Sequence, residues 1–317
     1  MNELFSIIIP VHNREKLIKE TLRSVVGQEY RPIHLVLVDN NSTDNSIAVA
    51  RDFLTEYESE NFIVTVAEEL RKGACAARNK GVTLTDAQYI MFLDDDDMLS
   101  SFRTITTIVK EFADTNADIV GFTAQLCKGN KKTLRHYSFT NSIKEQILHC
   151  MLSTQCFAVK RSFFDIVGGW DERVKRWQDW NLGIRMMLHN PKISWIKKPH
   201  LVNIRVHKSS ITGGGYLHSN EALEEAIVLT AEAVMNSGVE EREDISASIY
   251  GRMPILAAHY LREGSLTVAK RAVSLYQSKV KLSVIKKIWI YLLIIYTFFG
   301  GRGAGRLINC FNIKLKL

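Results

Sequence analysis

The sequence predicts an α/β fold with a doubly wound, mainly parallel sheet and a C-terminal helical extension. Two observations predict the sheet: short apolar, β-forming runs alternate with helical segments, and polar turns follow the ends of these runs. A third observation predicts the extension, because apolar residues recur at helical spacing from residue 220 onward. We therefore expect two parts, residues 1–215 and residues 216–317.

The first strands are expected at residues 5–10, 34–38 and 62–66, where the apolar, β-branched residues are concentrated. Helical spacing predicts a helix between the second and third of these strands, from residue 47 to about residue 57. Residues 73–81 predict a short helix that ends at Gly81, because glycine commonly follows the last helical turn.

Residues 89–93 predict a fourth, buried strand, and Asp94, Asp95, Asp96 and Asp97 follow it directly. In open α/β sheets ligands bind at the carboxyl ends of the strands, and adjacent carboxylates repel one another unless a positive group lies among them. Mg²⁺ or Mn²⁺ together with phosphate oxygens suits such oxygen ligands. The alternative is a solvated loop in which one aspartate caps the next helix.

The remaining elements follow from the same patterns, although the alternation of strands and helices weakens after residue 100. Residues 127–135 predict a polar, basic loop. The other expected elements are strands at 118–122, 193–196 and 202–207, and helices at 102–112, 180–188, 221–235, 245–261 and 266–276.

Four motifs occur in order: SIIIPVHNRE (6–15), VDNNSTDNS (38–46), GACAARNKG (73–81) and FLDDDD (92–97). With GGWDE (168–172) and QDW (178–180), they resemble the family 2 inverting glycosyltransferases, which have the GT-A, or nucleotide-diphosphosugar transferase, fold. The resemblance covers about the first 215 residues. It implies a metal-dependent, hexosyltransferase-like enzyme with a UDP-sugar donor. The implied acceptor is a hydroxyl of a glycan or lipid-linked glycan in cell-surface polysaccharide biosynthesis.

The resemblance assigns donor-binding roles to four residues before the acidic run. Pro10 and Asn13 match the loop that lies against the nucleotide, and Asp39 matches the aspartate that recognises the uracil ring. Arg78 matches a residue that faces the donor diphosphate or sugar, where a guanidinium binds phosphate oxygens well. The alternatives are that Asp39 only caps the following helix and that Arg78 is a surface cation.

In the acidic run the resemblance places the metal motif at Asp94 and Asp96. Asp96 is then the direct metal ligand, and Asp94 contacts ribose or the water shell of the metal. Because an aspartate also occupies the variable position, a register one residue later, with Asp95 and Asp97 in these roles, stays open. His207 matches a histidine found near metal and diphosphate, and its alternative is a structural role.

The resemblance assigns the chemical step to Asp179, which matches the second acid of a Glu-Asp pair and is therefore the expected general base. A sugar hydroxyl becomes a good nucleophile when a carboxylate accepts its proton. Here Gln178 replaces the first acid of the pair. The alternative for Asp179 is an N-cap of the following helix. Trp177 and Trp180 flank the pair, where they either stack on an acceptor sugar or pack in the core.

The formal net charge of +7 comes from the C-terminal part, since residues 270–317 hold ten Lys or Arg and no Asp or Glu. Residues 285–299 are almost wholly apolar, but crossing a bilayer takes about 20 such residues. We expect this basic tail to lie on an anionic membrane surface rather than to bind nucleic acid. The alternative is that the apolar face packs on the catalytic domain or forms a homodimer contact.

Five cysteines without a C-x-x-C pair predict neither a disulfide framework nor a zinc site. No signal peptide is recognised at the start, so the expected location is the cytoplasm, peripheral at the inner face of the cell membrane. Two other functions stay open: a metal-dependent nucleotidyltransferase, and a catalytically weak sugar-nucleotide-binding assembly subunit, for which Gln178 is the hint.

Overall fold

The computed structural model describes residues 2–135, 139–207, 215–301, 303–304 and 307. Contacts divide the chain into two compact units. The sheet unit contains Met1–Asn141, Met151–Glu172 and His189–Lys208, and the helical unit contains Ser142–Cys150, Arg173–Leu188 and Ser209–Leu317. Two short segments from the middle of the chain therefore pack with the C-terminal helices.

The sheet unit is built on a seven-stranded sheet in the order β10-β6-β9-β4-β1-β2-β3. Every neighbouring pair is parallel except the two that involve β9, so the predicted doubly wound, mainly parallel sheet is confirmed. The strands are β1 (Phe5–Val11), β2 (Ile33–Asp39), β3 (Phe62–Glu68), β4 (Tyr89–Phe92), β6 (Ile119–Phe122), β9 (Phe157–Lys160) and β10 (Ile193–Ile196).

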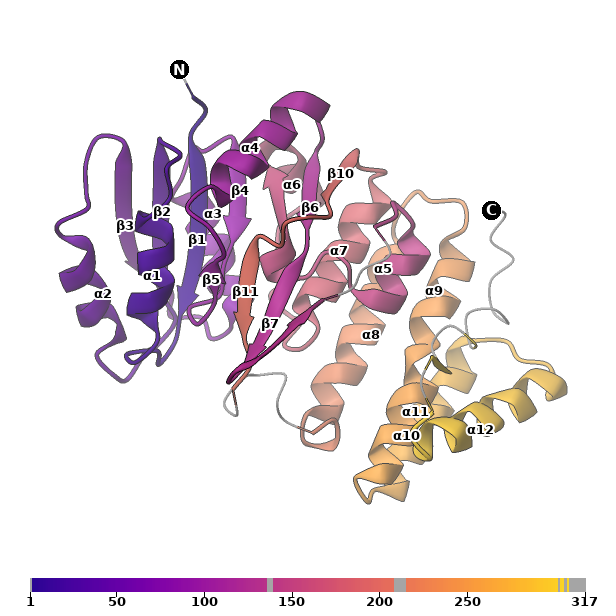
Figure 1. Cartoon of the computed structure of the whole chain (residues 1–317). Helices are drawn as coiled ribbons and strands as arrows, with labels where there is room; N and C mark the ends of the chain where they lie inside the picture. Colours follow the sequence, from indigo (N-terminus) through magenta and orange to yellow (C-terminus); the bar gives the residue numbers. More distant parts are fainter. Residues whose placement is uncertain (1, 136–138, 208–214, 302, 305–306, 308–317) are drawn as a thin grey trace. The chain divides into compact units, whose positions relative to one another are not determined.

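Helices cover both faces of this sheet (Figure 1). Successive side chains of a strand point to opposite faces, so Ile7 of β1 joins one core with Leu22 of α1 and Ile108 of α4. Ile8 points to the other face, where it contacts α3. The helices of this unit are α1 (Ile18–Val26), α2 (Ser46–Leu54), α3 (Ala74–Thr83), α4 (Thr104–Thr115) and α6 (Arg161–Val167).

The prediction that Gly81 ends its helix is wrong, because α3 continues to Thr83. Gly81 instead lies where α3 approaches β1 closely. A Cβ at this position would lie 2.4 Å from Ile8 Cγ2. The absence of a side chain therefore serves packing of the helix on the strand rather than termination of the helix.

Two further differences concern strands. The basic loop expected at 127–135 is largely a hairpin, formed by β7 (Ala124–Lys128) and β8 (Lys131–Leu134), in a second sheet with the order β5-β11-β7-β8. All four residues of β8 are exposed, so no apolar alternation marks it in the sequence. The other strands of this sheet are β5 (Met98–Leu99) and β11 (Val202–Arg205). The short β9 was not predicted either.

The helical unit surrounds its own core, whose largest side chains include Trp180, Tyr260 and Tyr276. The single helix expected at 245–261 is two helices that meet at Gly251, and Pro254 lies in the first turn of the second, where its missing N–H costs no hydrogen bond. The helices are α5 (Ile143–His149), α7 (Gln178–Leu188), α8 (Asn220–Met235), α9 (Arg242–Tyr250), α10 (Arg252–Arg262), α11 (Leu266–Lys279) and α12 (Val284–Phe298). Among the described residues, no helix is long and apolar enough to span a membrane.

Candidate active site

Three loops come together at the carboxyl edge of the sheet, after β1, β2 and β4. These strands are parallel neighbours, so their ends lie at one edge. The backbone N–H of His12 donates to Asp95 Oδ2 at 2.8 Å, which joins the loop after β1 to the acidic loop after β4. Asn13 Oδ1 accepts a hydrogen bond from the N–H of Thr43 at 2.8 Å, which joins the first loop to the loop after β2. The predicted donor-binding segments are therefore neighbours.

Asp39 is the last residue of β2, and one of its oxygens has a local role. Oδ1 accepts a hydrogen bond from the N–H of Ser42 at 3.2 Å, which forms a local turn. The alternative that Asp39 caps the following helix is wrong, because α2 begins at Ser46 and Asn45 holds its N-cap position. Within the part of the chain that the structure describes, the other oxygen, Oδ2, accepts no hydrogen bond. The turn thus orients the carboxylate and leaves an acceptor atom for a ligand. Pro10 lies within β1, where its ring is buried.

Two of the four carboxylates after β4 are anchored by backbone N–H groups. Asp95 accepts from His12, and Asp97 Oδ1 accepts from the N–H of Arg205 at 2.8 Å. Burial raises the pKa of Asp95 to about 7, although the nearby Arg14 guanidinium acts in the opposite direction. Burial also raises the pKa of Asp97 well above its usual value, and the charges of Asp94 and Asp96 add to this effect.

Asp96 meets His207, a residue that lies far from it in the chain. His207 Nε2 is 2.7 Å from Asp96 Oδ2. A second hydrogen bond holds the same two chain segments together, between Asp97, the residue after Asp96, and Arg205, two residues before His207 and the last residue of β11. The structure therefore brings together the two residues that were predicted as metal ligands.

Asp94 is held from two sides by side chains. Arg78 Nη2 donates to its Oδ1 at 2.8 Å, and Gln155 Nε2 donates to its Oδ2. The Arg78 guanidinium also lies over the Trp170 ring, 4.6 Å from its centroid. Trp170 is buried and meets Phe92 edge to face, so its ring packs in the core. The predicted contact of Arg78 with a donor diphosphate stays a prediction.

Two residues of this site were missed by sequence reasoning, Arg14 and Gln155. Arg14 Nε lies 3.0 Å from Asp95 Oδ1 and 3.3 Å from Asp96 Oδ2. Arg14 belongs to the motif at residues 6–15, and its positive charge in a loop expected beside the acidic loop could have indicated this contact. Gln155 reaches Asp94 because β9 runs antiparallel to β4, so its start lies near the end of β4. The sequence pattern gave no signal for that direction.

The protein itself therefore supplies positive groups among the carboxylates, and their repulsion alone does not require a metal. The two side chains nevertheless fit a divalent cation by type, because a carboxylate oxygen of Asp96 and an imidazole nitrogen of His207 lie 2.7 Å apart. No cluster of three or more His, Cys, Asp or Glu arranged to hold a metal is found among the described residues. A cation here would thus take most of its ligands from water and diphosphate, as Mg²⁺ commonly does.

Asp179 belongs to the helical unit, in the first turn of α7. Its Oδ1 accepts a hydrogen bond from the N–H of Trp180 at 2.9 Å. Its role as general base stays a prediction. Trp180 is almost fully buried, which decides its predicted alternatives in favour of packing, whereas Trp177 is only partly buried.

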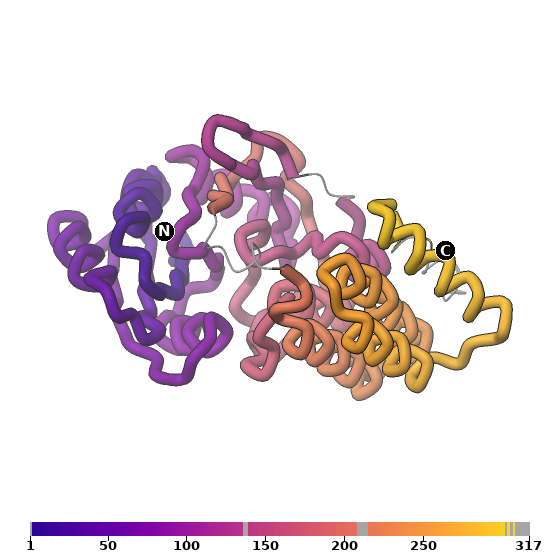
Figure 2. Tube along the Cα trace, turned by 90° about the horizontal axis from the view of Figure 1, so that it is seen from below, coloured from indigo at the N-terminus to yellow at the C-terminus, as the bar shows by residue number. Residues whose placement is uncertain are grey.

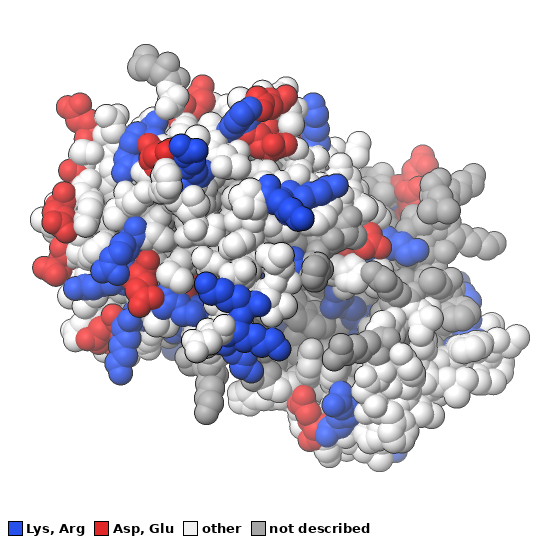
Figure 3. Space-filling model, in the orientation of Figure 1, with Lys and Arg blue, Asp and Glu red and all other residues white. Residues whose placement is uncertain are grey.

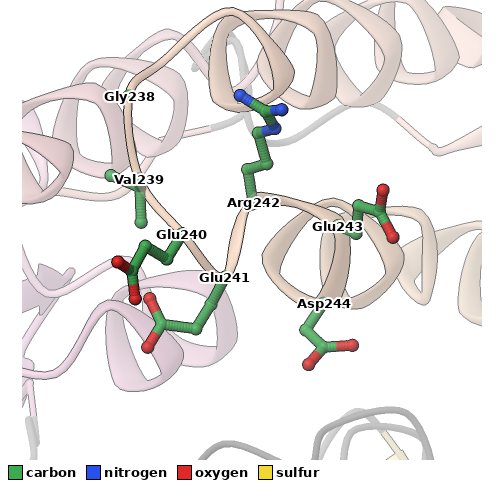
Figure 4. Close-up of a pocket in the computed structure, with 7 residues that line it drawn as sticks. All are labelled: Gly238, Val239, Glu240, Glu241, Arg242, Glu243 and Asp244. Atoms are coloured by element: carbon green, nitrogen blue, oxygen red, sulfur yellow. The ribbon is translucent and has the colours of Figure 1, made fainter.

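The helical unit also has a surface hollow, which is lined by residues 238–244. Figure 4 shows it at the connection between α8 and α9, where the side chains of Glu240 and Glu241 lie close together and Arg242 points away from them. Its lining consists of one exposed, mainly acidic turn, Gly238–Asp244, and it offers no apolar wall for a ligand. We assign it no function.

Comparison with known proteins identifies the family. The model of glycosyl transferase family 2 matches residues 6–168, which include the loops after β1, β2 and β4, and the chain belongs to this family. Glycosyltransferase GlyG of Streptococcus pneumoniae is 31% identical over 120 residues, which are 38% of this chain and 38% of that protein. The matched part is thus well under half of this relative.

Solved structures share the fold over nearly the whole chain. S. aureus TarS 1-349 in complex with UDP-GlcNAc has a TM-score of 0.74 at 17% identity, covering 97% of this chain and 88% of that one. The mannosyltransferase PcManGT from Pyrobaculum calidifontis, in complex with GDP-Man and Mn²⁺, has a TM-score of 0.58 at 18% identity, covering 99% and 89%. These similarities confirm the GT-A fold.

Proposed function

We propose that this chain is an inverting glycosyltransferase that transfers a sugar from a UDP-sugar donor to a hydroxyl of a glycan or lipid-linked glycan in cell-surface polysaccharide biosynthesis. The observation that carries the proposal is the contact of Asp96 with His207 at the sheet edge where β2 ends in Asp39. A donor bound along this edge would have its base at Asp39 and its diphosphate at Asp96. The catalytic domain in this proposal is residues 1–215, and residues 216–317 are its helical extension.

The side chains divide the reaction between them. Asp39 accepts a hydrogen bond from the base, Asn13 and Pro10 line the nucleotide, and Arg78 orients Asp94. Mn²⁺ or Mg²⁺, when bound by Asp96 and His207, supplies positive charge next to the departing diphosphate. Asp179 accepts the proton of the acceptor hydroxyl. At the same time the hydroxyl oxygen bonds to the anomeric carbon of the donor sugar, and the bond between that carbon and UDP breaks.

The contacts of the four carboxylates support the earlier of the two registers. Asp95 and Asp97 are the pair anchored by backbone N–H groups. The partners of Asp94 and Asp96 include the side chains of Arg78, Arg14 and His207, and side chains can turn toward a ligand more easily than a backbone can. We therefore assign metal binding to Asp96 and ribose or metal-water contact to Asp94. Asp95 contributes to the donor site by holding the loop after β1.

A panel of UDP- and GDP-sugars, incubated with the full chain and Mn²⁺, tests the proposed function. We expect slow hydrolysis of one UDP-sugar, because water can replace the acceptor, and we expect chelation of the metal to stop it. Calorimetry with the same panel measures binding separately. A chain that binds UDP-sugars tightly but hydrolyses none of them and transfers none to added glycans would instead be a binding subunit.

We also propose that α12 attaches the protein to an anionic membrane surface. Only four residues of α12, Ile290, Leu293, Ile294 and Thr297, are buried within the helical unit. The exposed remainder is large and apolar, and Figure 3 shows the surface at the lower right, where Figure 1 labels α12, as almost wholly uncharged. Figure 2 shows α12 as the yellow helix at the border of the helical unit. The exposed apolar residues are Val284, Ile285, Ile288, Trp289, Tyr291, Leu292, Ile295, Tyr296, Phe298 and Phe299.

Charge and residue type favour lipid over a second protein copy. Lys281, Lys286 and Lys287 accompany the helix, and no acidic residue occurs from residue 270 to the end. Each cation near an anionic surface contributes about 1 kcal/mol, and Trp and Tyr favour the headgroup boundary. Part of the basic tail, residues 302, 305–306 and 308–317, lies outside the described residues.

Flotation with phosphatidylglycerol-containing liposomes tests this attachment. The double substitution Ile288→Glu and Leu292→Glu should abolish flotation and leave donor hydrolysis unchanged, because both side chains are exposed and neither belongs to the donor site. The matched control, Leu70→Glu with Leu266→Glu, changes two leucines elsewhere that are at least as exposed and should float as the wild type does. Salt should weaken the wild-type binding. Absence of wild-type flotation, with a dimer that the double substitution dissociates, would establish the homodimer alternative.

A further inference from the structure

The backbone just before the proposed base is strained. Trp177 has a φ of +53°, a left-handed conformation that is unfavourable for a bulky side chain. Gln178 and Asp179 follow it directly as the first residues of α7. Strain of this kind persists only where surrounding contacts enforce it. Contacts within the helical unit must therefore stabilise the turn at Trp177.

Arg252, the first residue of α10, makes those contacts. Its guanidinium carbon lies 4.9 Å from the ring centroid of Trp177 and 4.7 Å from that of Trp180. The two indoles, which flank Gln178 and Asp179, meet edge to face at 5.6 Å. The Arg252 guanidinium thus contacts both tryptophans that flank the pair Gln178 and Asp179.

The guanidinium is itself fixed by the end of α5. Arg252 Nε donates to the carbonyl oxygen of Ile147 at 3.1 Å, and Nη2 donates to the carbonyls of Ile147 and Leu148. The Trp180 indole N–H donates to the same Ile147 oxygen at 2.9 Å. Carbonyl groups at a helix C-terminus favour a cation, so α5 holds Arg252 in place without a carboxylate.

Arg252 remains charged at neutral pH in this setting. Burial lowers the pKa of its guanidinium to about 10, and the charges of Cys150, Tyr216 and Asp179 act in the opposite direction. The favourable interaction with Asp179 is consistent with the placement of the cation beside the turn. All of these groups belong to the helical unit.

We infer that Arg252 is a positioning residue for the glycosyl transfer step, which fixes the turn at Trp177 and so aims the Asp179 carboxylate at the acceptor. The inference rests on the proposed function, because it takes Asp179 as the base. It means that the helical unit, which extends beyond the family match at residues 6–168, takes part in the chemistry. Small misplacements of a reacting group can cost up to about a hundredfold in rate.

Kinetics of Arg252→Met and Arg252→Lys test the inference. Arg252→Met should lower kcat for transfer about ten- to a hundredfold, while UDP affinity and the KM for the donor stay within about twofold. Arg252→Lys keeps the positive charge but not the planar guanidinium with its several N–H donors, so its kcat should lie between those of Arg252→Met and the wild type. Arg271→Met is the matched control, because Arg271 lies in the same unit but pairs with Glu224, and its kcat should equal that of the wild type. Equal kcat for Arg252→Met and wild type would overturn the inference.

A double-mutant cycle with Asp179→Asn separates positioning from general loss of folding. If Arg252 acts through Asp179, Arg252→Met should lower the residual rate of the Asp179→Asn protein little or not at all. An undiminished further loss of ten- to a hundredfold in that background would mean that the substitution damages the unit as a whole, and the inference would fail. If Asp179→Asn alone keeps the wild-type rate, the assignment of the base fails instead.

Discussion

Replacing Asp179 with asparagine should lower the rate of sugar transfer by at least about a hundredfold and leave the affinity for the donor unchanged. Asparagine has nearly the same shape and can still accept the hydrogen bond from the N–H of Trp180, so the first turn of α7 should persist. It cannot accept the proton of an acceptor hydroxyl, which is the function of a general base. Steady-state kinetics with saturating acceptor measures the loss, and calorimetry with UDP measures binding.

Two other variants make this result specific. Asp244→Asn changes an acidic residue of the same unit, near the start of α9, and should leave the rate unchanged. Gln178→Glu restores the pair of acids found in the family and should keep transfer active. Transfer by Asp179→Asn at nearly the wild-type rate would show that another group accepts the proton.

Replacing Asp96 with alanine should weaken metal-dependent UDP binding by roughly 10–100-fold, the range seen when groups that support a metal are removed. The substitution takes away the carboxylate that His207 contacts, while Asp95 keeps its ion pair with Arg14 and its hydrogen bond from His12. The loop should therefore stay folded. Calorimetry with UDP, in Mn²⁺ and in a chelator, measures the effect.

The chelator gives the decisive comparison for Asp96. Wild-type affinity for UDP should fall in the chelator to about the level of the Asp96→Ala protein, which should itself respond little to chelation. Asp114→Ala, which removes an exposed carboxylate paired with Lys110, should behave as the wild type does. If the wild type binds UDP equally well with and without metal, the metal has no place in donor binding.

The sequence allowed good prediction of the fold where apolar periodicity is strong. The strands that carry Ile7, Leu35 and Met91 are buried on both faces, so continuous apolar runs marked them clearly. The β8 strand of the hairpin lacked such a run, because all four of its residues are exposed and backbone pairing with β7 holds it. Gly81 was misjudged since a glycine that permits close packing and one that ends a helix look the same in sequence.

Motif matches proposed candidate residues but not the contacts between them. Asp39, Asp96 and His207 were proposed from such matches, and the structure brings His207 to Asp96. Two residues were not predicted, because their roles depend on distances across the fold. These are Gln155, which contacts Asp94, and Arg14, which lies between Asp95 and Asp96. The same holds for Arg252, whose partners are spread over three helices.

The antiparallel β9 has a consequence for the order in which the molecule can form. Ala158 pairs with Met91 of β4 on one side and with Val120 of β6 on the other, so both older strands keep an open edge until residues 157–160 leave the ribosome. Unpaired edges are sites of aggregation, and contacts between distant parts of a chain form slowly. The insertion that closes these edges also delivers Gln155 to Asp94. A nascent chain therefore joins β6 to the β4 side of its sheet and gives Asp94 its partner Gln155 in the same folding event, before β10 pairs with β6.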